Sequence, residues 1–195
     1  MDGGNDDGVR DGHRDRIGEE GSSMEGLRLA GELMAISART APKSGGKDFV
    51  EVKILQGESV EALAREMVRF EEETGKANFD RDGENVRNSP VVLLVGINEA
   101  KPLGLNCGGC GFSSCEELLK ARPGEGEFKG FQCAFRVLDL GIALGSAVKT
   151  ASLLNVDNRI MYRIGTVARR MGLCDWDLVM GVPLSATGKS IYFDR

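Results

Sequence analysis

The stretch VVLLVGI, residues 91–97, is a continuous apolar run that directly follows Pro90. A run of this length, rich in branched residues, is typical of a central strand that is buried on both faces. Residues 49–55 instead alternate apolar and charged side chains, which predicts a half-exposed strand. We therefore expect the fold to be organised around a sheet with residues 91–97 near its centre.

Helical and strand patterns alternate on both sides of this run. An α+β fold with helices flanking a mixed sheet is the fold class that this order predicts. Residues 75–90 are polar and predict an irregular segment, and Pro183 is expected to end the last strand. The expected elements are helix 25–39, strand 49–55, helix 59–74, strand 91–97, helix 115–121, a long buried helix to about Leu154, strand 159–164, helix 165–172 and strand 177–182.

Four of the five cysteines follow the apolar run as a C-x2-C-x4-C-x17-C array. They are Cys107, Cys110, Cys115 and Cys133, and Gly108, Gly109 and Gly111 lie among the first three. A cubane 4Fe–4S cluster needs four soft thiolate ligands and a backbone that can fold closely around it. Glycines allow that approach and allow positive φ. The array therefore indicates that these four thiolates hold one 4Fe–4S cluster.

The surrounding residues suit an anionic centre. Ser113 and Ser114 are good N-cap residues for the expected helix 115–121, and Cys133 opens the long apolar helix. Two helix N-termini would then face the cluster, where their dipoles favour negative charge. We also expect Lys129 and Arg136 to add positive charge nearby.

Three other interpretations of the cysteines compete with the cluster. A disulfide framework is typical of small secreted domains, and nothing in this chain resembles a signal peptide. A structural zinc site usually pairs two C-x2-4-C units, and only one is present here. A catalytic thiol needs a base, and the single histidine, His13, lies in a polar segment.

Composition limits the classes of function. A length of 195 residues with 41% hydrophobic residues predicts one domain with a sizeable core and one inserted subdomain. The formal charge of −5 argues against nucleic-acid and anionic-membrane partners. No apolar run approaches the length of a membrane span. Clustered cysteines without an export signal predict a reducing, cytoplasmic location. Residues 1–24 are too polar to bury a core and predict a disordered tail.

The cysteine motif resembles a known family. NCGGCGFSSC followed by a distant FQC is similar to the small 4Fe–4S domain with a C-G-x-C-G-x3-C…C signature, found in corrinoid iron–sulfur proteins and in electron-transfer subunits of Rnf-type complexes. The resemblance implies that Cys107, Cys110, Cys115 and Cys133 are the ligands. The whole chain also resembles uncharacterised prokaryotic proteins described as containing a ferredoxin domain.

Three further stretches resemble the flavin-binding nitroreductase fold. They are MAISARTAPKSGG, LDLGIALGSAVKTASLLNV and VARRMGLCDWDLVMGVPLS. The resemblance implies a nitroreductase-like core from residues 25–100 and 134–195, a cluster-binding insertion at 101–133, and a homodimer. The helix that carries the flavin-phosphate motif of nitroreductases has no counterpart here. If FMN binds, Arg39, Lys43 and Lys189 are the candidate contacts.

These observations support three functions. The first is a 4Fe–4S redox protein that transfers single electrons to a partner protein, which needs no acid–base residue. The second is a nitroreductase-like oxidoreductase in which the cluster feeds a flavin. The third is a structural module in which zinc or a cluster stabilises the insertion.

Overall fold

The structure, a computed structural model, describes residues 17–121 and 126–193. In chain order its elements are α1 (Ile17–Thr40), the 3-10 turn η1 (Ser44–Gly46), β1 (Val50–Gln56), α2 (Glu58–Thr74), α3 (Phe79–Arg87), β2 (Val91–Ile97), α4 (Cys115–Lys120), α5 (Ala134–Leu153), β3 (Asp157–Asn158), α6 (Tyr162–Arg170) and β4 (Leu178–Ser185). Among the helices in these ranges, none is both long enough and apolar enough to cross a membrane.

The described strands form one sheet in the order β1-β2-β4-β3. The α+β class is confirmed, and β2 lies between two neighbours as its continuous apolar run predicted. The sheet is not mixed, however, because every pairing in it is antiparallel. Val50 of β1 pairs with Ile97, while Leu184 of β4 pairs with Val91. The two pairings therefore mark opposite ends of β2.

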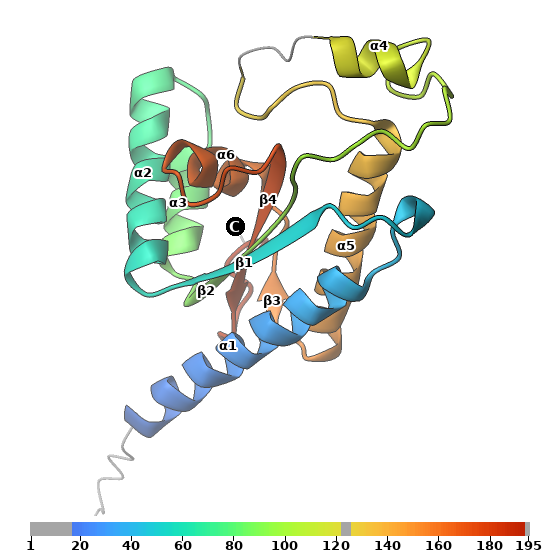
Figure 1. Ribbon diagram of the computed structural model, residues 1–195. Coiled ribbons are helices and arrows are strands. Elements are labelled where there is room, and N and C mark those ends of the chain that lie inside the picture. The colour runs from blue at the N-terminus through green and yellow to red at the C-terminus, as the bar shows by residue number, and fades with distance from the viewer. Residues whose placement is uncertain (1–16, 122–125, 194–195) are drawn as a thin grey trace, which may run out of the picture.

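Helices cover both faces of this sheet (Figure 1). Val92 and Leu94 of β2 belong to one core with residues of α2, α3 and α6. Val91, Leu93 and Val95 point the other way and belong to a second core with residues of α1 and α5. All seven residues of β2 are buried. Successive side chains of a strand point to opposite faces, so a strand between two helix layers must be apolar at every position.

Several predicted boundaries are wrong. α1 begins at Ile17, so residues 17–24 are helical and not part of a disordered tail; residues 1–16 lie outside the described part. Residues 75–90 contain α3, because Phe79 and Val86 recur at helical spacing on a buried face. Residues 159–164 form no full strand. Met161 makes one bridge to Gly181, and α6 starts at Tyr162.

Pro183 lies inside β4 and does not end it. Gly181 exchanges both of its backbone hydrogen bonds with Met161, on the side of β4 away from β2. By the alternation of a strand, the nitrogen of Pro183 faces that same side. The missing N–H therefore leaves the β2–β4 hydrogen bonds intact, which is why the strand continues to Ser185.

Tyr192, near the C-terminus, packs into the core of its own chain. Tyr192 is 1% exposed, and its hydroxyl lies 2.7 Å from the hydroxyl of Ser89. Burial raises the pKa of Tyr192 well above its usual value, so this hydroxyl stays neutral. Phe193 remains exposed.

Two glycines bring α6 very close to β4. A Cβ at Gly165 would lie 1.8 Å from the backbone oxygen of Val179, and one at Gly181 would lie 2.0 Å from a methyl carbon of Ile164. At both positions a side chain would overlap atoms already in place. The contact therefore requires glycine on each side.

We predict that Gly165→Ala lowers the free energy of unfolding by at least about 1–3 kcal/mol, because the added methyl group overpacks the contact. The matched control is Gly26→Ala in α1, where a Cβ meets nothing within 4 Å. Removing a helical glycine there should stabilise by about 0.5–1 kcal/mol. Urea unfolding followed by circular dichroism measures both; equal midpoints would contradict the close contact.

Candidate functional site

The four cysteines of the array lie on two segments that lead into helices. Cys107 and Cys110 are in the loop between β2 and α4, Cys115 is the first residue of α4, and Cys133 is the N-cap of α5. All four are free thiols. Cys107 is exposed, Cys110 and Cys115 are half-buried, and Cys133 is buried. Cys174, the fifth cysteine, lies in the core formed with α2, α3 and α6, where burial raises the pKa of its thiol.

The glycines shape the first cysteine segment as predicted. Gly108 and Gly111 have φ of 72° and 87°, in the left-handed region that favours glycine. The amide of Gly111 donates to the carbonyl of Gly108 at 2.9 Å, which closes a tight turn around Cys110. The amide of Cys115 donates to the side-chain oxygen of Asn106 at 2.8 Å. The second hydrogen bond closes the wider loop 106–115, which contains this turn.

Ser113 and Ser114 begin α4 as predicted. The hydroxyl of Ser114 accepts a hydrogen bond from the amide of Glu117 at 3.2 Å, and the Glu117 carboxylate accepts one from the hydroxyl of Ser113 at 2.7 Å. This exchange is a capping box shifted by one residue. Hydrogen bonds from Ser113 lower the pKa of Glu117.

Two contacts bring the loop to the start of α5. The rings of Phe112 and Phe131 pack edge to face, with centroids 5.2 Å apart. A Cβ at Gly109 would lie 3.6 Å from both the sulfur of Cys107 and the Cβ of Ala134, the first residue of α5. The loop that carries the first three cysteines therefore lies against the helix whose N-cap is the fourth.

The sulfur atoms themselves are not gathered into a closed metal site. Within residues 17–121 and 126–193, no group of three or more histidine, cysteine, aspartate or glutamate side chains converges closely enough to hold a metal ion. The donor chemistry nevertheless suits a thiolate-ligated centre, because the four thiols are free and a left-handed glycine turn surrounds Cys110. The ligand set remains a prediction.

The two basic residues expected beside the cysteines are both paired with acids. The ammonium of Lys129 lies 3.3 Å from carboxylate oxygens of Asp175 and Asp177. Arg136 donates to Asp139 at 2.9 Å. A neighbouring carboxylate offsets each positive charge, which reduces the net charge that these two residues add beside the cysteines.

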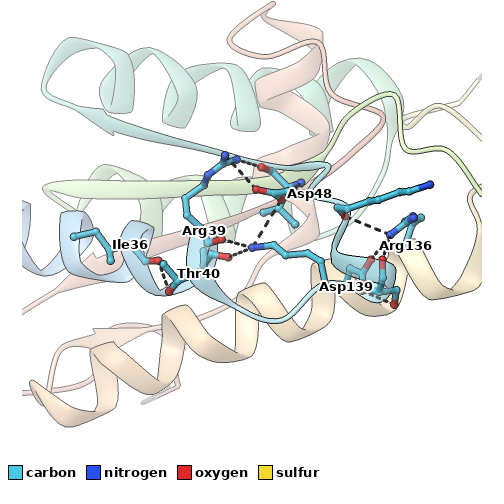
Figure 2. Close-up of polar contacts among 11 residues, drawn as sticks. Ile36, Arg39, Thr40, Asp48, Arg136 and Asp139 are labelled. Carbon is cyan, nitrogen blue, oxygen red and sulfur yellow. Dashed lines mark hydrogen bonds and ion pairs between the residues drawn. The ribbon is translucent and has the colours of Figure 1, made fainter. Parts of the chain in front are cut away.

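Arg136 instead anchors the first turn of α5 (Figure 2). It is 1% exposed and donates to the carbonyls of Lys101 and Ser44, each at 2.9 Å. Asp139 in turn accepts from the amide and hydroxyl of Ser44, at 2.8 and 2.7 Å. Lys101 begins the cysteine segment and Cys133 ends it. The pair therefore joins both ends of that segment to the η1 turn.

This network was not predicted from the sequence. The signal was present as an arginine and an aspartate three residues apart, a spacing that places both on one face of a helix. In a helix expected to be buried, such a pair predicts a buried ion pair. A buried pair of this kind costs desolvation and is retained when further hydrogen bonds satisfy both groups.

We predict that Asp139→Asn lowers the free energy of unfolding by roughly 3–5 kcal/mol, because it leaves the buried charge of Arg136 without its counter-ion. Asp175→Asn is the matched control, since the Asp175 side chain is 95% exposed. It should change stability little. Urea unfolding of both variants checks this. An Asp139→Asn midpoint equal to that of the control would show that the pair is not needed.

Of the candidate flavin contacts, Arg39 lies beside Asp48 at the end of α1 (Figure 2), and Lys43 is also close to Asp48. Arg39 donates to the carbonyl of Val50 and lies 3.2 Å from Asp48. Lys43 donates to carbonyls at the end of α1, at 3.2 Å for Ala38, and lies 3.8 Å from Asp48. These contacts neutralise the helix C-terminus and the aspartate.

Lys189 lies at the other end of the sheet. It follows β4, whose residue Leu184 pairs with Val91 at the beginning of β2. Arg39 is bonded to Val50, which pairs with Ile97 at the end of β2. Seven strand residues, roughly 20 Å, separate these ends. Within one chain, the structure therefore does not bring Lys189 to the other two.

Comparison with known sequences gives a family and a relative. A protein-family model described as "uncharacterized protein containing a ferredoxin domain (DUF2148)" matches residues 129–195. The match includes Cys133, while the other three cysteines of the array precede it. An uncharacterized protein of Archaeoglobus fulgidus is 52% identical over 180 residues, which are 92% of this chain and 97% of that protein.

Solved structures share the fold at low sequence identity. A nitroreductase-like family protein from Bacillus cereus matches with a TM-score of 0.56 and 12% identity, over 84% of this chain and 76% of that one. The FMN-dependent nitroreductase NfnB from Mycobacterium smegmatis, in complex with NADPH, matches with 0.54 and 12%, over 86% and 82%. A nitroreductase with bound FMN from Desulfitobacterium hafniense matches with 0.53 and 11%, over 83% and 78%. The predicted nitroreductase-like fold is thus confirmed.

Proposed function

This chain belongs to the same family as the uncharacterized protein of Archaeoglobus fulgidus, and we propose that it is an iron–sulfur redox protein that transfers single electrons to a partner protein. The ferredoxin-domain family match supports an iron–sulfur redox role. The observation that carries the finer proposal is the packing of the C-x2-C loop against the helix whose N-cap is Cys133.

In this proposal Cys107, Cys110, Cys115 and Cys133 hold one 4Fe–4S cluster, which would supply a one-electron couple. The protein's own contribution is to position the thiolates and to favour their negative charge. Cys133 caps α5 without a side-chain hydrogen bond, so its sulfur lies where the helix dipole favours an anion. Burial around Cys133 and exposure at Cys107 would give the site one shielded side and one side open to a partner.

We predict that anaerobically purified protein contains iron and acid-labile sulfide in equal amounts, close to four of each per chain for a cubane cluster. Cys110→Ala should lose most of the iron and the visible absorbance, because one ligand is missing. Cys174→Ala is the matched control and should keep both, since Cys174 lies in a separate core. Equal spectra for Cys110→Ala and the unsubstituted protein would refute the ligand set.

The same anaerobically purified protein also tests two alternative functions. A flavin absorption band beside the iron would favour a nitroreductase-like oxidoreductase, which is suggested by the fold shared with the FMN-bound protein of Desulfitobacterium hafniense. Colourless protein with stoichiometric zinc would favour a structural module. Because Lys189 lies far from Arg39 and Lys43, the three residues do not form one flavin-phosphate site within a single chain.

We further propose that the chain is a homodimer built on the outer face of α5. Long apolar residues remain exposed along this helix in the single chain: Leu138, Ile142 and Leu153. Lys149 is the one charged residue on its exposed face. A helix that is apolar nearly all round is normally buried. Exposed Leu29, Leu33 and Ile36 make the neighbouring face of α1 apolar as well.

Two glycines on the same face of α5 favour a helix as the occupant. A Cβ at Gly141 or Gly145 meets nothing within 4 Å, so neither glycine is needed for packing against the part of the chain that the structure describes. Two small residues four positions apart allow another helix to approach closely. A second copy of this chain presents the same surface, as a two-fold interface requires.

We predict that Leu138→Glu converts the dimer to a monomer, because a charge at the centre of an apolar interface would lose its hydration. Leu119→Glu, on α4, is the control and should leave the dimer intact, since Leu119 is also exposed but lies on another helix. Sedimentation velocity measures both. A monomeric unsubstituted protein would contradict this interface.

A further inference from the structure

The ring contact between Phe112 and Phe131 joins the two cysteine-bearing segments. Phe112 lies between Cys110 and Cys115, and Phe131 lies two residues before Cys133. Their centroids are 5.2 Å apart with an interplanar angle of 86°. Edge-to-face pairs with this geometry are favourable beyond the area they bury. The pair thus links segments that are distant in sequence, at the place where the proposed ligands have to meet.

Phe131 adopts a backbone conformation that a phenylalanine rarely takes. Its φ is 52°, in the left-handed region, and the residue is 52% exposed. A bulky residue in this region is strained, and an exposed ring gains little from burial. Neither backbone preference nor burial in a hydrophobic core explains why a phenylalanine occupies position 131. The ring contact with Phe112 explains it.

Hydrogen bonds at Lys129 and at Cys133, on either side of Phe131, constrain the backbone conformation of Phe131. The amide of Lys129 donates to the carbonyl of Asp177 at 2.9 Å, which attaches the chain beside β4. Cys133 is held as the N-cap of α5 by the hydrogen bonds that its carbonyl accepts from Arg136 and Val137. The chain between these points has to turn sharply, and in the observed turn the ring of Phe131 meets Phe112.

The position of Phe112 also depends on a residue with left-handed backbone conformation. It follows Gly111, whose φ of 87° only glycine adopts easily. The Gly108–Gly111 turn directs the chain so that Phe112 reaches Phe131, while Gly109 lies against Ala134. The ring pair is therefore a second contact, beside the one at Gly109, between this loop and the chain that leads into α5.

We propose that Phe112 and Phe131 are positioning residues of the four-cysteine site. Their ring pair holds the Cys107–Cys115 loop against the N-terminus of α5, which limits how far the first three cysteines can move from Cys133 and shields Cys133 from solvent. This inference rests on the proposed function for the iron centre, but the ring pair acts on the loop whether or not a metal is bound.

The first experiment uses the metal-free, reduced full-length chain and an alkylating probe, iodoacetamide. Labelling of each cysteine is followed by mass spectrometry in the unsubstituted protein and in Phe112→Ala, Phe131→Ala and the double variant. Losing the ring pair should accelerate labelling of the buried Cys133 about 2- to 10-fold. The double variant should match the single variants, because either substitution removes the same contact. Cys174 reports on the fold and should stay slow in all of them.

The matched control is Leu119→Ala, which removes another exposed apolar side chain of the same segment. It should leave the labelling rate of Cys133 unchanged. A Cys133 rate that is unaffected by Phe112→Ala and Phe131→Ala, or is raised equally by Leu119→Ala, would overturn the inference. Since Phe131 is half exposed, its substitution should not prevent folding.

The second experiment measures iron release to a ferrous chelator from the anaerobically loaded full-length protein. Phe112→Ala and Phe131→Ala should release iron about 2- to 10-fold faster than the unsubstituted protein and than Leu119→Ala. Equal release rates would overturn the positioning role while leaving the proposed function intact. An unsubstituted protein that takes up no iron would overturn the proposed function, and Cys133 labelling would then still decide whether the ring pair positions the loop.

Discussion

The buried ion pair between Arg136 and Asp139 sets the distance between the two ends of the cysteine segment. Arg136 donates to the carbonyl of Lys101, the first residue of the segment, and lies one turn after Cys133, its last residue. Asp139 fixes the same turn of α5 to Ser44. A group of thiolates can share one centre only if these ends are held at a constant separation. A loop of this length would otherwise have many arrangements.

The sheet gives this anchor its rigidity. β2 is buried on both faces, with α2, α3 and α6 on one side and α1 and α5 on the other. β2 ends at Ile97, shortly before the cysteine segment, and α5 begins directly after it, so the segment connects two elements of the core (Figure 1). Sites held by well-packed elements keep their geometry better than sites carried by loops alone. The nitroreductase-like fold thus serves here as a scaffold for a segment that projects from it.

Much of the fold follows from local patterns in the sequence. The run at residues 91–97 predicted a central strand, because an uninterrupted apolar run has two faces to bury. α3 was not predicted because most of its residues are polar and its apolar face is short. One of its buried residues, Asp82, is itself charged and forms ion pairs with Arg81 and Arg163. The early end predicted for β4 failed because the side of the strand that Pro183 faces depends on the pairing of Gly181 with Met161. No local pattern contains that information.

The site was predictable in its parts but not in its arrangement. The left-handed glycines and the serine cap of α4 were expected from residue chemistry alone. Lys129 and Arg136 were expected to add positive charge nearby, but the sequence analysis did not identify the carboxylates that pair with them. The Phe112–Phe131 pair joins positions in separate segments, so no periodicity could predict it.

The most direct test of the iron–sulfur site is X-ray absorption at the iron edge of the anaerobically purified chain. The predicted spectrum shows iron surrounded by sulfur with further iron atoms nearby, whereas iron bound only through oxygen or nitrogen, or no iron at all, would contradict it.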